Sequence, residues 1–446
     1  MKLTLCFLTL SLSLPLLASN VRNFHPNHLF IKVKDGFELP QNLKFDSKKN
    51  IFGNLYLVSV KNPSFLEESL KNNPAIEYTQ KDFYGEKTSA PKLERLDSAS
   101  AQMKFNQSLD FMMSSFNDPQ ASKLWAFGDK SGMSVESAYA NLPNVTPMEV
   151  IVAVVDTGVD HRHEDLKDVM WVNTAEIPGD KIDNDKNGYV DDVHGINTLV
   201  RDAQGKATGD TMGSHWHGTH VAGTIAATQN NGVGIAGVAN NVKIMAIRTV
   251  PDDADELDSN IVEAFKYAAQ NGARVINCSF GKSKNEGGMV VRDVINEISK
   301  KGVLVVASAG NDSMGPFSWH DNDKDPKYPA SFDSQNLMVI ASTTNSGGLS
   351  SFSNVGKKSV DIASPGSNIF STVKDNGYGM ASGTSMAAPN ASGVAAMVLG
   401  YFPHLSPVEL KEVLMKSSVK VEEFKSKTAS GGRINLKTAL EYALTK

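Results

Sequence analysis

The apolar residues of the chain change their pattern near residue 148. Beyond this point, short continuous apolar runs alternate with longer amphipathic stretches. A short apolar run bounded by turn residues is typical of a strand that is buried on both faces of a sheet. The runs that we predict to be such strands are residues 149–156, 242–249, 273–280, 302–310 and 337–343.

The amphipathic stretches at residues 259–272 and 290–302 lie between these runs, have helical spacing and end in glycine. Strands that alternate with helices predict an α/β fold, in which a parallel sheet has helices on both faces and the domain has three layers. The ligand crevice of such a fold forms beyond the carboxyl ends of its strands. The residues that directly follow the predicted strands are therefore the first candidates for a functional site.

The amino-terminal part is organised differently. Its stretches with strand or helix patterns are residues 28–34, 54–60, 63–73 and 75–82. They predict a small α+β unit over residues 26–86. Residues 87–116 are rich in Ser, Lys, Gln and Asn without a sustained period, so we interpret them as a linker or wrapped arm before a large domain over residues 117–446.

Residues 1–19 have the pattern of a secretory signal peptide. Lys2 precedes an apolar run that reaches Leu17, and the small residues Ala18 and Ser19 follow it. The run is short for a membrane anchor, and no second long apolar run appears. We therefore expect a secreted protein that has no membrane contact after signal removal. It would be extracellular, or periplasmic in a Gram-negative bacterium.

Composition and charge exclude some partners. The 446 residues include 44 Lys and Arg against 49 Asp and Glu, a formal net charge of −5, so we expect no nucleic-acid partner. Of two cysteines, Cys6 lies in the predicted signal peptide, which leaves Cys278 without a disulfide partner after export. Cys278 lies in an apolar run, which favours a small buried side chain over a reactive nucleophile.

Three motifs place reactive residue types next to predicted strands or helix starts. Asp156 ends a predicted strand, His217 lies in a stretch of small residues, and Ser385 opens a helix-like stretch with Met-Ala-Ala behind it. Taken singly, Asp156 and Ser385 could each cap a helix, and a histidine could be packed in the core. His215, His217 and His220 could also hold a metal, but their spacing lacks the H-E-x-x-H pattern of a zinc protease.

Taken together, the motifs Asp156-Thr-Gly, His217-Gly-Thr-His-Val-Ala-Gly-Thr and Gly-Thr-Ser385-Met-Ala-Ala-Pro occur in the order Asp, His, Ser. With the stretches VINCSFG, SAGN, YPAS and DIASPG, the chain resembles the subtilisin-like serine proteases, the subtilases or peptidase family S8. The resemblance implies a parallel-sheet, three-layer catalytic domain in which Ser385 attacks the scissile carbonyl, His217 moves the proton and Asp156 orients the imidazole. It also implies that Asn311 and the backbone N–H of Ser385 bind the oxyanion.

The resemblance further implies where a substrate lies. The substrate backbone would pair as an added strand along Ser279, Phe280 and Gly281. The wall of the primary specificity pocket would be Ser308, Ala309 and Gly310, whose small size favours an apolar or medium-sized side chain. Lys282 stands where relatives often have glycine, and it would either favour acidic substrate positions or be solvated.

An acidic segment at residues 180–195 could bind calcium. Oxygen donors at alternate positions next to a glycine suit this ion, and the candidate ligands are Asp183, Asp185, Asn187 and Asp191. The segment is not an EF-hand, because the spacing lacks the closing Glu. Subtilases often carry structural calcium, so we expect either a structural Ca²⁺ site or a solvated acidic loop. We expect no cofactor for catalysis.

The resemblance also gives the amino-terminal unit a role, that of a propeptide which helps the protease domain fold and acts as an intramolecular inhibitor until it is cleaved. An unrelated small binding domain is the alternative for this unit. We therefore expect a secreted serine endopeptidase, made as a zymogen, monomeric and acting on proteins or peptides. A catalytically silent peptide-binding protein on the same fold is the competing hypothesis.

Overall fold

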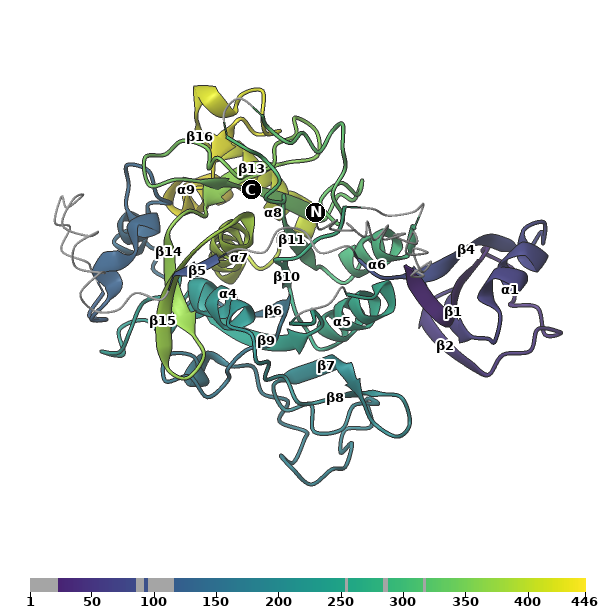
Figure 1. Ribbon diagram of the computed structural model, residues 1–446. Coiled ribbons are helices and arrows are strands. Elements are labelled where there is room, and N and C mark those ends of the chain that lie inside the picture. Colours follow the sequence, from purple (N-terminus) through teal and green to yellow (C-terminus); the bar gives the residue numbers. More distant parts are fainter. Residues whose placement is uncertain (1–22, 86–91, 95–115, 253–255, 284–287, 316–317) are drawn as a thin grey trace, which may run out of the picture.

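The computed structural model describes residues 23–85, 92–94, 116–252, 256–283, 288–315 and 318–446. The predicted signal peptide and most of the predicted linker lie outside these residues. Figure 1 shows a small amino-terminal unit beside a much larger unit that is built around one long sheet. Among the described residues, no helix combines the length and the apolar character that crossing a membrane requires.

The small unit is an antiparallel sheet with one helix on it. Its elements are β1 (Phe24–Val33), β2 (Ser47–Phe52), β3 (Leu55–Ser59), α1 (Pro63–Leu70) and β4 (Ile76–Phe83). The strand order is β2-β3-β1-β4, and the alternating residues Leu29, Ile31 and Val33 of β1 pack with Leu70 of the helix. The strands and the helix that we predicted for this part of the chain are present. The sequence analysis did not predict strand β2.

The large unit is built on a sheet with ten strands in the order β16-β17-β13-β12-β11-β10-β6-β9-β7-β8. All neighbouring pairs from β17 to β7 are parallel, and the two outermost pairs are antiparallel. The five predicted strands are its consecutive centre, β12 to β9. The bounds are β6 (Val150–Asp156), β7 (Gly195–Arg201), β8 (Ala207–Thr208), β9 (Val242–Arg248), β10 (Val275–Cys278), β11 (Leu304–Ser308), β12 (Leu337–Thr343), β13 (Ile362–Pro365), β16 (Val419–Lys420) and β17 (Gly432–Arg433).

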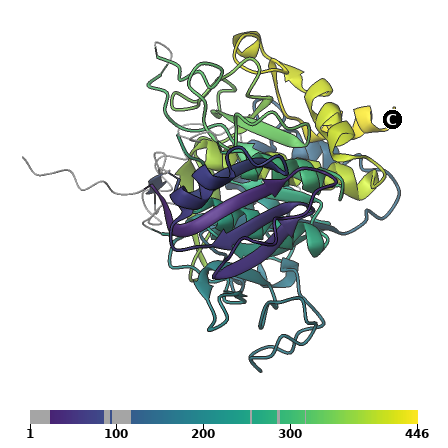
Figure 2. The ribbon, with the colours of Figure 1, turned by 90° about the vertical axis from the view of Figure 1, so that its right-hand side faces the viewer.

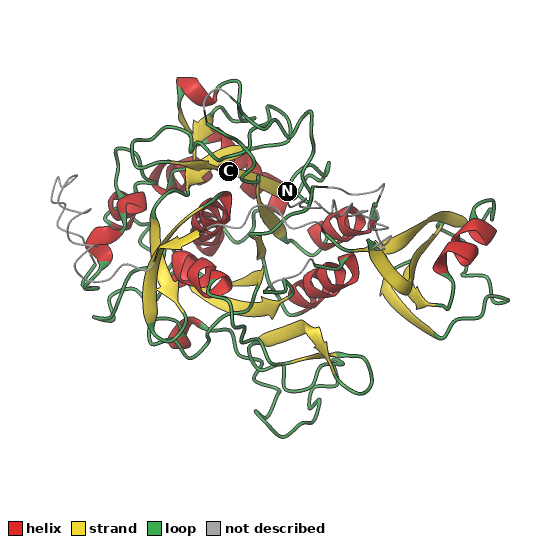
Figure 3. Ribbon diagram, in the orientation of Figure 1, coloured by secondary structure: helices red, strands yellow, loops and turns green. Residues whose placement is uncertain are grey.

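Helices cover both faces of this sheet, because its strands are apolar on both sides. In β6, Val152 and Val154 pack in one core cluster, whereas Ala153 and Val155 pack in the other. The first cluster includes residues of α4 (His217–Ala226) and α7 (Thr384–Tyr401), and the second those of α5 (Asp258–Gln270) and α6 (Val290–Ser299). Figure 3 shows these helices on the two sides of the strands.

The remaining elements surround this core. The helices are α3 (Val135–Tyr139), α8 (Pro407–Lys416) and α9 (Leu436–Ala443), with short 3₁₀ turns at Ala121–Lys123, Trp125–Phe127, Lys167–Val169 and Glu422–Phe424. A hairpin of β14 (Ile369–Val373) and β15 (Gly377–Ser382) packs against α4 and leads directly into α7. The short strand β5 (Lys92–Glu94), from the predicted linker, pairs with the free edge of β15.

The small unit lies against the helices α5 and α6 of the large unit, and Figure 2 views the molecule from its side. The Gln80 side chain accepts hydrogen bonds from the N–H groups of Met289 and Val290, at the start of α6, at 2.6 and 2.9 Å. Asp82 accepts one from the N–H of Ser259, in the first turn of α5, at 2.9 Å. These acceptors satisfy helix N–H groups that have no partner within their own helix.

Candidate active site

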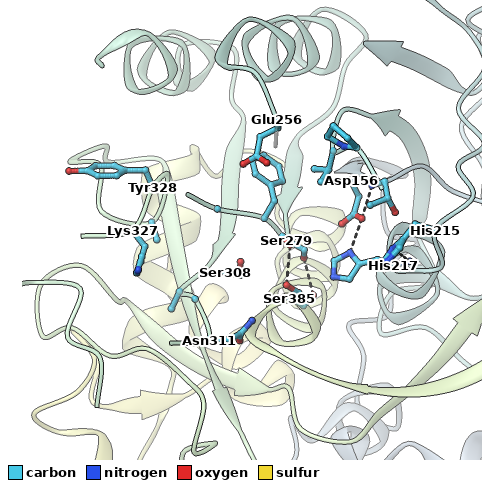
Figure 4. Close-up of a pocket in the computed structure, with 18 of the residues that line it drawn as sticks. Asp156, His215, His217, Glu256, Ser279, Ser308, Asn311, Lys327, Tyr328 and Ser385 are labelled. Atoms are coloured by element: carbon cyan, nitrogen blue, oxygen red, sulfur yellow. Dashed lines mark hydrogen bonds and ion pairs between the residues drawn. The ribbon is translucent and has the colours of Figure 1, made fainter. Parts of the chain in front are cut away.

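A pocket lies at the carboxyl ends of β6, β10 and β11 (Figure 4). Asp156, His217, Ser385 and Asn311, which are far apart in the sequence, all line it. This is the edge of the sheet where the alternation of strands and helices predicts a crevice.

Asp156 and His217 are held together by a strand end and a helix start. Gly158 has φ of +102°, and a Cβ there would lie 2.5 Å from the carbonyl oxygen of Thr211, so the turn after β6 requires glycine. His217 Nδ1 lies 2.7 Å from Asp156 Oδ1, and both side chains are buried. Because a carboxylate only accepts hydrogen bonds, Nδ1 carries the proton, which leaves Nε2 of the neutral ring as a proton acceptor.

Ser385 is the second residue of α7 and is buried at the pocket floor. Its hydroxyl donates a hydrogen bond of 3.0 Å to the carbonyl oxygen of Ser279, and the Ser279 hydroxyl donates one of 2.9 Å to the Ser385 carbonyl oxygen. These two bonds fix α7 to the segment after β10. Figure 4 shows Ser385 between His217 on one side and Asn311 on the other.

Asn311 comes from the turn after β11. Gly310 has φ of +108°, and a Cβ there would lie 2.4 Å from Asn354 Nδ2, so this turn also requires glycine. The Asn311 side-chain oxygen accepts hydrogen bonds from the N–H of Thr384 at 2.8 Å and from its hydroxyl at 3.0 Å. Both donors fix the orientation of the carboxamide, and Figure 4 shows its nitrogen on the side of Ser385.

The substrate-binding residues expected from the sequence come together in the same pocket: Ser279, Phe280, Gly281, Ser308, Ala309 and Gly310. The pocket also contains His215, which the sequence offered only as a possible metal ligand, and side chains that sequence reasoning did not single out, namely Asp252, Glu256, Lys327 and Tyr328. The YPAS stretch, residues 328–331, could have identified Tyr328 from the sequence, but it gives no indication of Lys327, which directly precedes it.

Both expectations for Lys282 were wrong. Its side chain is buried, and its ammonium group lies 2.5 Å from Asp258 Oδ1, at the start of α5. It is therefore neither solvated nor among the residues that line the pocket. Burial raises the pKa of Asp258, and the attraction of Lys282 opposes this rise.

The three histidines do not form a metal site. His220 is fully buried, and its Nε2 donates a hydrogen bond of 3.0 Å to the carbonyl oxygen of Ile369. Burial lowers the pKa of His220 to about 3, so it is neutral. Among the described residues, the group of potential metal ligands is instead Glu176, Asp183 and Asp185. Cys278 is also fully buried and burial raises its pKa, as expected for an unreactive thiol.

The acidic segment brings together only part of the expected calcium ligands. Carboxylate oxygens of Asp183, Asp185 and Glu176 lie within 4.8 Å of one another, and Glu176 was not expected. Asp191 instead accepts hydrogen bonds from the N–H groups of Gly179 and Lys181. The Asn187 side chain donates to Asp185 and Asp192, so its nitrogen points toward these carboxylates.

Comparisons with known proteins agree with these observations. The subtilase family matches residues 148–433. The "Subtilisin-like protease 1" of Plasmodium berghei (strain Anka) is 32% identical over 306 residues, which cover 66% of this chain and 50% of that protein. The "Extracellular basic protease" of Dichelobacter nodosus is 31% identical over 365 residues, which cover 74% and 56%. The chain spans about half the length of the curated relatives it matches.

Two solved structures have the same fold. A protease from Pseudoalteromonas arctica PAMC 21717 superposes with a TM-score of 0.58 at 28% identity, over 74% of this chain and 100% of that one. Fervidolysin from Fervidobacterium pennivorans, a keratinolytic enzyme related to subtilisin, gives a TM-score of 0.68 at 21% identity, over 95% and 62%. The predicted α/β fold with three layers is thus confirmed. Because the family match covers more than half of its residues, the chain belongs to the subtilase family.

Proposed function

We propose that this protein is a serine endopeptidase in which Asp156, His217 and Ser385 are the catalytic triad. The observation that carries the proposal is the 2.7 Å hydrogen bond from His217 Nδ1 to Asp156, which leaves Nε2 as the base, in the pocket that contains Ser385 and Asn311. The carboxylate holds the imidazole in this tautomer and stabilises the imidazolium that forms during the reaction.

The reaction uses these groups in two steps. The Ser385 hydroxyl leaves the Ser279 carbonyl, its oxygen attacks the scissile carbon, and its proton moves to His217 Nε2. The tetrahedral oxyanion accepts hydrogen bonds from Asn311 Nδ2 and from the backbone N–H of Ser385. The C–N bond then breaks and His217 returns the proton to the amine. In the second step, a water molecule gives a proton to His217 and its oxygen attacks the acyl carbon. The bond from this carbon to the Ser385 oxygen then breaks, and His217 returns the proton to that oxygen.

The amino-terminal unit is proposed to be the inhibitory propeptide of a zymogen. Two contacts at its end support this role. Tyr84 forms a backbone bridge with Leu257, and the N–H of Gly85 donates a hydrogen bond of 2.8 Å to the carbonyl oxygen of Glu256, a residue that lines the pocket. The carboxyl-terminal end of the unit therefore lies next to a residue of the candidate active site.

Contacts on both sides of residues 86–91 indicate where the chain would be cleaved. On the other side of residues 86–91, Lys92 pairs with Ser382, three positions before Ser385 in the sequence. We propose that the protease cleaves its own chain between Gly85 and Lys92. Amino-terminal sequencing of the processed protein tests this. Self-cleavage is refuted if a Ser385→Ala variant is processed in isolation at the same bond as the wild type.

Export through the predicted signal peptide, a monomeric state and protein or peptide substrates complete the proposal. The name of the Dichelobacter nodosus relative, which describes an extracellular protease, supports export. Bound Ca²⁺ at Glu176, Asp183 and Asp185 would stabilise the acidic segment, because three carboxylate oxygens close together suit a hard cation. It would take no part in the catalytic steps.

Peptide hydrolysis by the processed protein tests the activity. We expect the wild type to hydrolyse internal bonds of a peptide, with kcat about 10⁶-fold above that of Ser385→Ala and about 10⁴-fold above that of Asp156→Asn. Exposed Asp168→Asn serves as the control that leaves the rate unchanged. A wild type that binds peptides without hydrolysing them would instead support the catalytically silent binding protein.

A further inference from the structure

The pocket wall beside Ser385 carries a buried ammonium group, that of Lys327. This residue lies in the loop between β11 and β12 and lines the pocket with Ser308, Ala309 and Gly310. Figure 4 shows Lys327 next to Ser308, on the opposite side of Ser385 from Asp156 and His217. The small residues of this wall favoured an apolar or medium-sized substrate side chain, but the wall also includes a positive charge.

Hydrogen bonds hold the backbone around Lys327 in place. Its N–H donates to the Ser331 hydroxyl at 3.1 Å, and its carbonyl oxygen accepts from the Ser331 N–H at 2.7 Å. The next residue, Tyr328, exchanges two backbone hydrogen bonds of 2.8 and 2.9 Å with Lys282. The residue after the lysine is therefore bound to Lys282, which directly follows the pocket residue Gly281.

The ammonium group is only partly satisfied. Its side chain is 8% exposed, and its Nζ donates one hydrogen bond among the described residues, of 3.1 Å, to Ser283 Oγ. Asp312 Oδ2 lies 3.6 Å away, beyond the usual length of a charge-assisted hydrogen bond, and also accepts from Asn354 at 2.9 Å. An ammonium has three donors, so Lys327 can still bind another acceptor.

The position of this charge relative to a substrate follows from the proposed function, on which the inference rests. A carbonyl attacked by Ser385 directs its oxygen toward Asn311. The resemblance to subtilases implies that Ser308, Ala309 and Gly310 form the wall of the primary specificity pocket, so we place the side chain on the acyl side of that carbonyl in the space bounded by these residues and Lys327. A carboxylate there would meet the ammonium away from Asp156 and Glu256, which Figure 4 shows in another part of the pocket.

We propose that Lys327 is a specificity-determining residue that selects substrates with glutamate or aspartate immediately before the scissile bond. The substrate carboxylate accepts a charge-assisted hydrogen bond from the Lys327 ammonium, in addition to the contacts that this ammonium already makes with Ser283 and Asp312. Asp312 competes for the same ammonium and moderates this preference.

Matched peptides that differ only at this residue test the proposal, with the processed protein as the enzyme. The peptides carry Glu, Gln, Asp, Asn or Leu. We expect kcat/KM of the acidic peptide to exceed that of its amide at least about tenfold in one of the two pairs, a difference of about 1.4 kcal/mol. The Lys327→Met variant should lose this ratio. The Asp312→Asn variant, which keeps the lysine and removes its competitor, should increase it.

Three results would overturn the proposal. Hydrolysis of the Leu peptide by the wild type without an advantage for either acidic peptide would exclude an acidic preference. An acidic preference that persists in Lys327→Met would exclude this lysine as its cause. If Lys327→Met does not fold, an unchanged ratio of kcat/KM between the acidic peptide and its amide in Asp312→Asn would exclude it instead. Failure to hydrolyse any of the peptides, together with no labelling of Ser385 by a fluorophosphonate, would overturn the protease function itself.

Discussion

At the scale of single residues, the geometry of the pocket depends on two glycine turns. Gly158 follows the strand that ends in Asp156, and Gly310 directly precedes Asn311. A side chain at either position would meet neighbouring atoms at 2.5 Å or less, in a backbone conformation that other residues rarely adopt. The carboxylate and the carboxamide are therefore held in place before a substrate binds, which is what stabilisation of a transition state requires.

Replacement of Asn311 by leucine tests the oxyanion site. Leucine has a similar shape and no donor, so we expect kcat to fall about 10²- to 10³-fold while KM changes much less. Steady-state kinetics on one peptide measure both constants. Asn345→Leu is the matched control, because Asn345 is exposed and does not line the pocket. An equal loss in both variants, or a change in KM alone, would contradict the assignment.

Some residues of the candidate site could be identified from the sequence, whereas the contacts of other residues could not. Asp156, His217 and Asn311 end or follow strands or begin a helix, so the pattern of elements points to them. The partners of Lys282 and Lys327 depend on how loops pack. Lys282 binds Asp258, 24 positions away, and Lys327 binds Ser283, 44 positions away. No local pattern encodes these contacts.

At the scale of elements, burial on both faces explains why the central strands could be predicted. Each has a continuous apolar run, as in β6 and β12, where all or nearly all residues are buried. By contrast, the first four residues of β2 (Ser47–Phe52) are exposed, and it has no apolar alternation that marks a strand. Strand β2 exists because it pairs with β3, which a local pattern does not reveal.

The helix α4 makes stability dependent on pH through His220. The folded protein holds this histidine neutral, with a pKa of about 3, whereas the unfolded chain binds a proton below about pH 6.5. The contribution of neutral His220 to the free energy of unfolding is therefore fully present above about pH 6.5. It is lost as the pH falls toward 3, by about 1.4 kcal/mol per pH unit.

Denaturant unfolding of Ser385→Ala, between pH 6.5 and pH 4, measures this effect without self-digestion. We expect the free energy of unfolding to fall more steeply with acidification in Ser385→Ala than in the double variant that also carries His220→Leu. Equal slopes in the two proteins would show that His220 does not remain neutral in the fold.

The start of α5 connects the small unit to the large one. Asp82 accepts a hydrogen bond from the N–H of Ser259, and a carboxylate is favourable at the positive end of a helix. Removal of this cap in Asp82→Ala should weaken binding of the cleaved unit about fivefold to thirtyfold. The inhibition constant of the cleaved unit measures it. Asp82→Asn keeps an acceptor, so the affinity of the cleaved unit should fall less in this variant than in Asp82→Ala. An equal loss of affinity in the two variants would contradict a role for the retained acceptor.

At the scale of the whole molecule, the packing of the small unit agrees with the proposed role of this unit as an inhibitory propeptide. The unit contacts α5 and α6 and extends Gly85 to the pocket, while Lys92 pairs beside the start of α7. The small α+β unit itself was predictable from its strand and helix patterns. Its location was not, because side chains such as Gln80 and Asp82 have no local feature that identifies their partner helices.

The acidic segment gives a prediction for the stability of the whole molecule. If calcium binds at Glu176, Asp183 and Asp185, a concentration about 100 times Kd adds about 2.7 kcal/mol to the free energy of unfolding. We therefore expect a chelator to lower Tm of Ser385→Ala by several degrees. A version that also carries Asp183→Asn should have a lower Tm in calcium and a smaller response to the chelator. Identical Tm values with and without chelator would contradict the site.

The most direct test of the central claim is the covalent labelling of the processed wild-type protein by a fluorophosphonate, followed by mass spectrometry of its peptides. A fluorophosphonate reacts with a serine that an adjacent base activates. We predict one phosphonyl adduct, on Ser385, which is absent from Ser385→Ala and strongly reduced in His217→Ala. A processed wild-type protein without an adduct, or with its adduct on another residue, would contradict the claim that Asp156, His217 and Ser385 form a working triad.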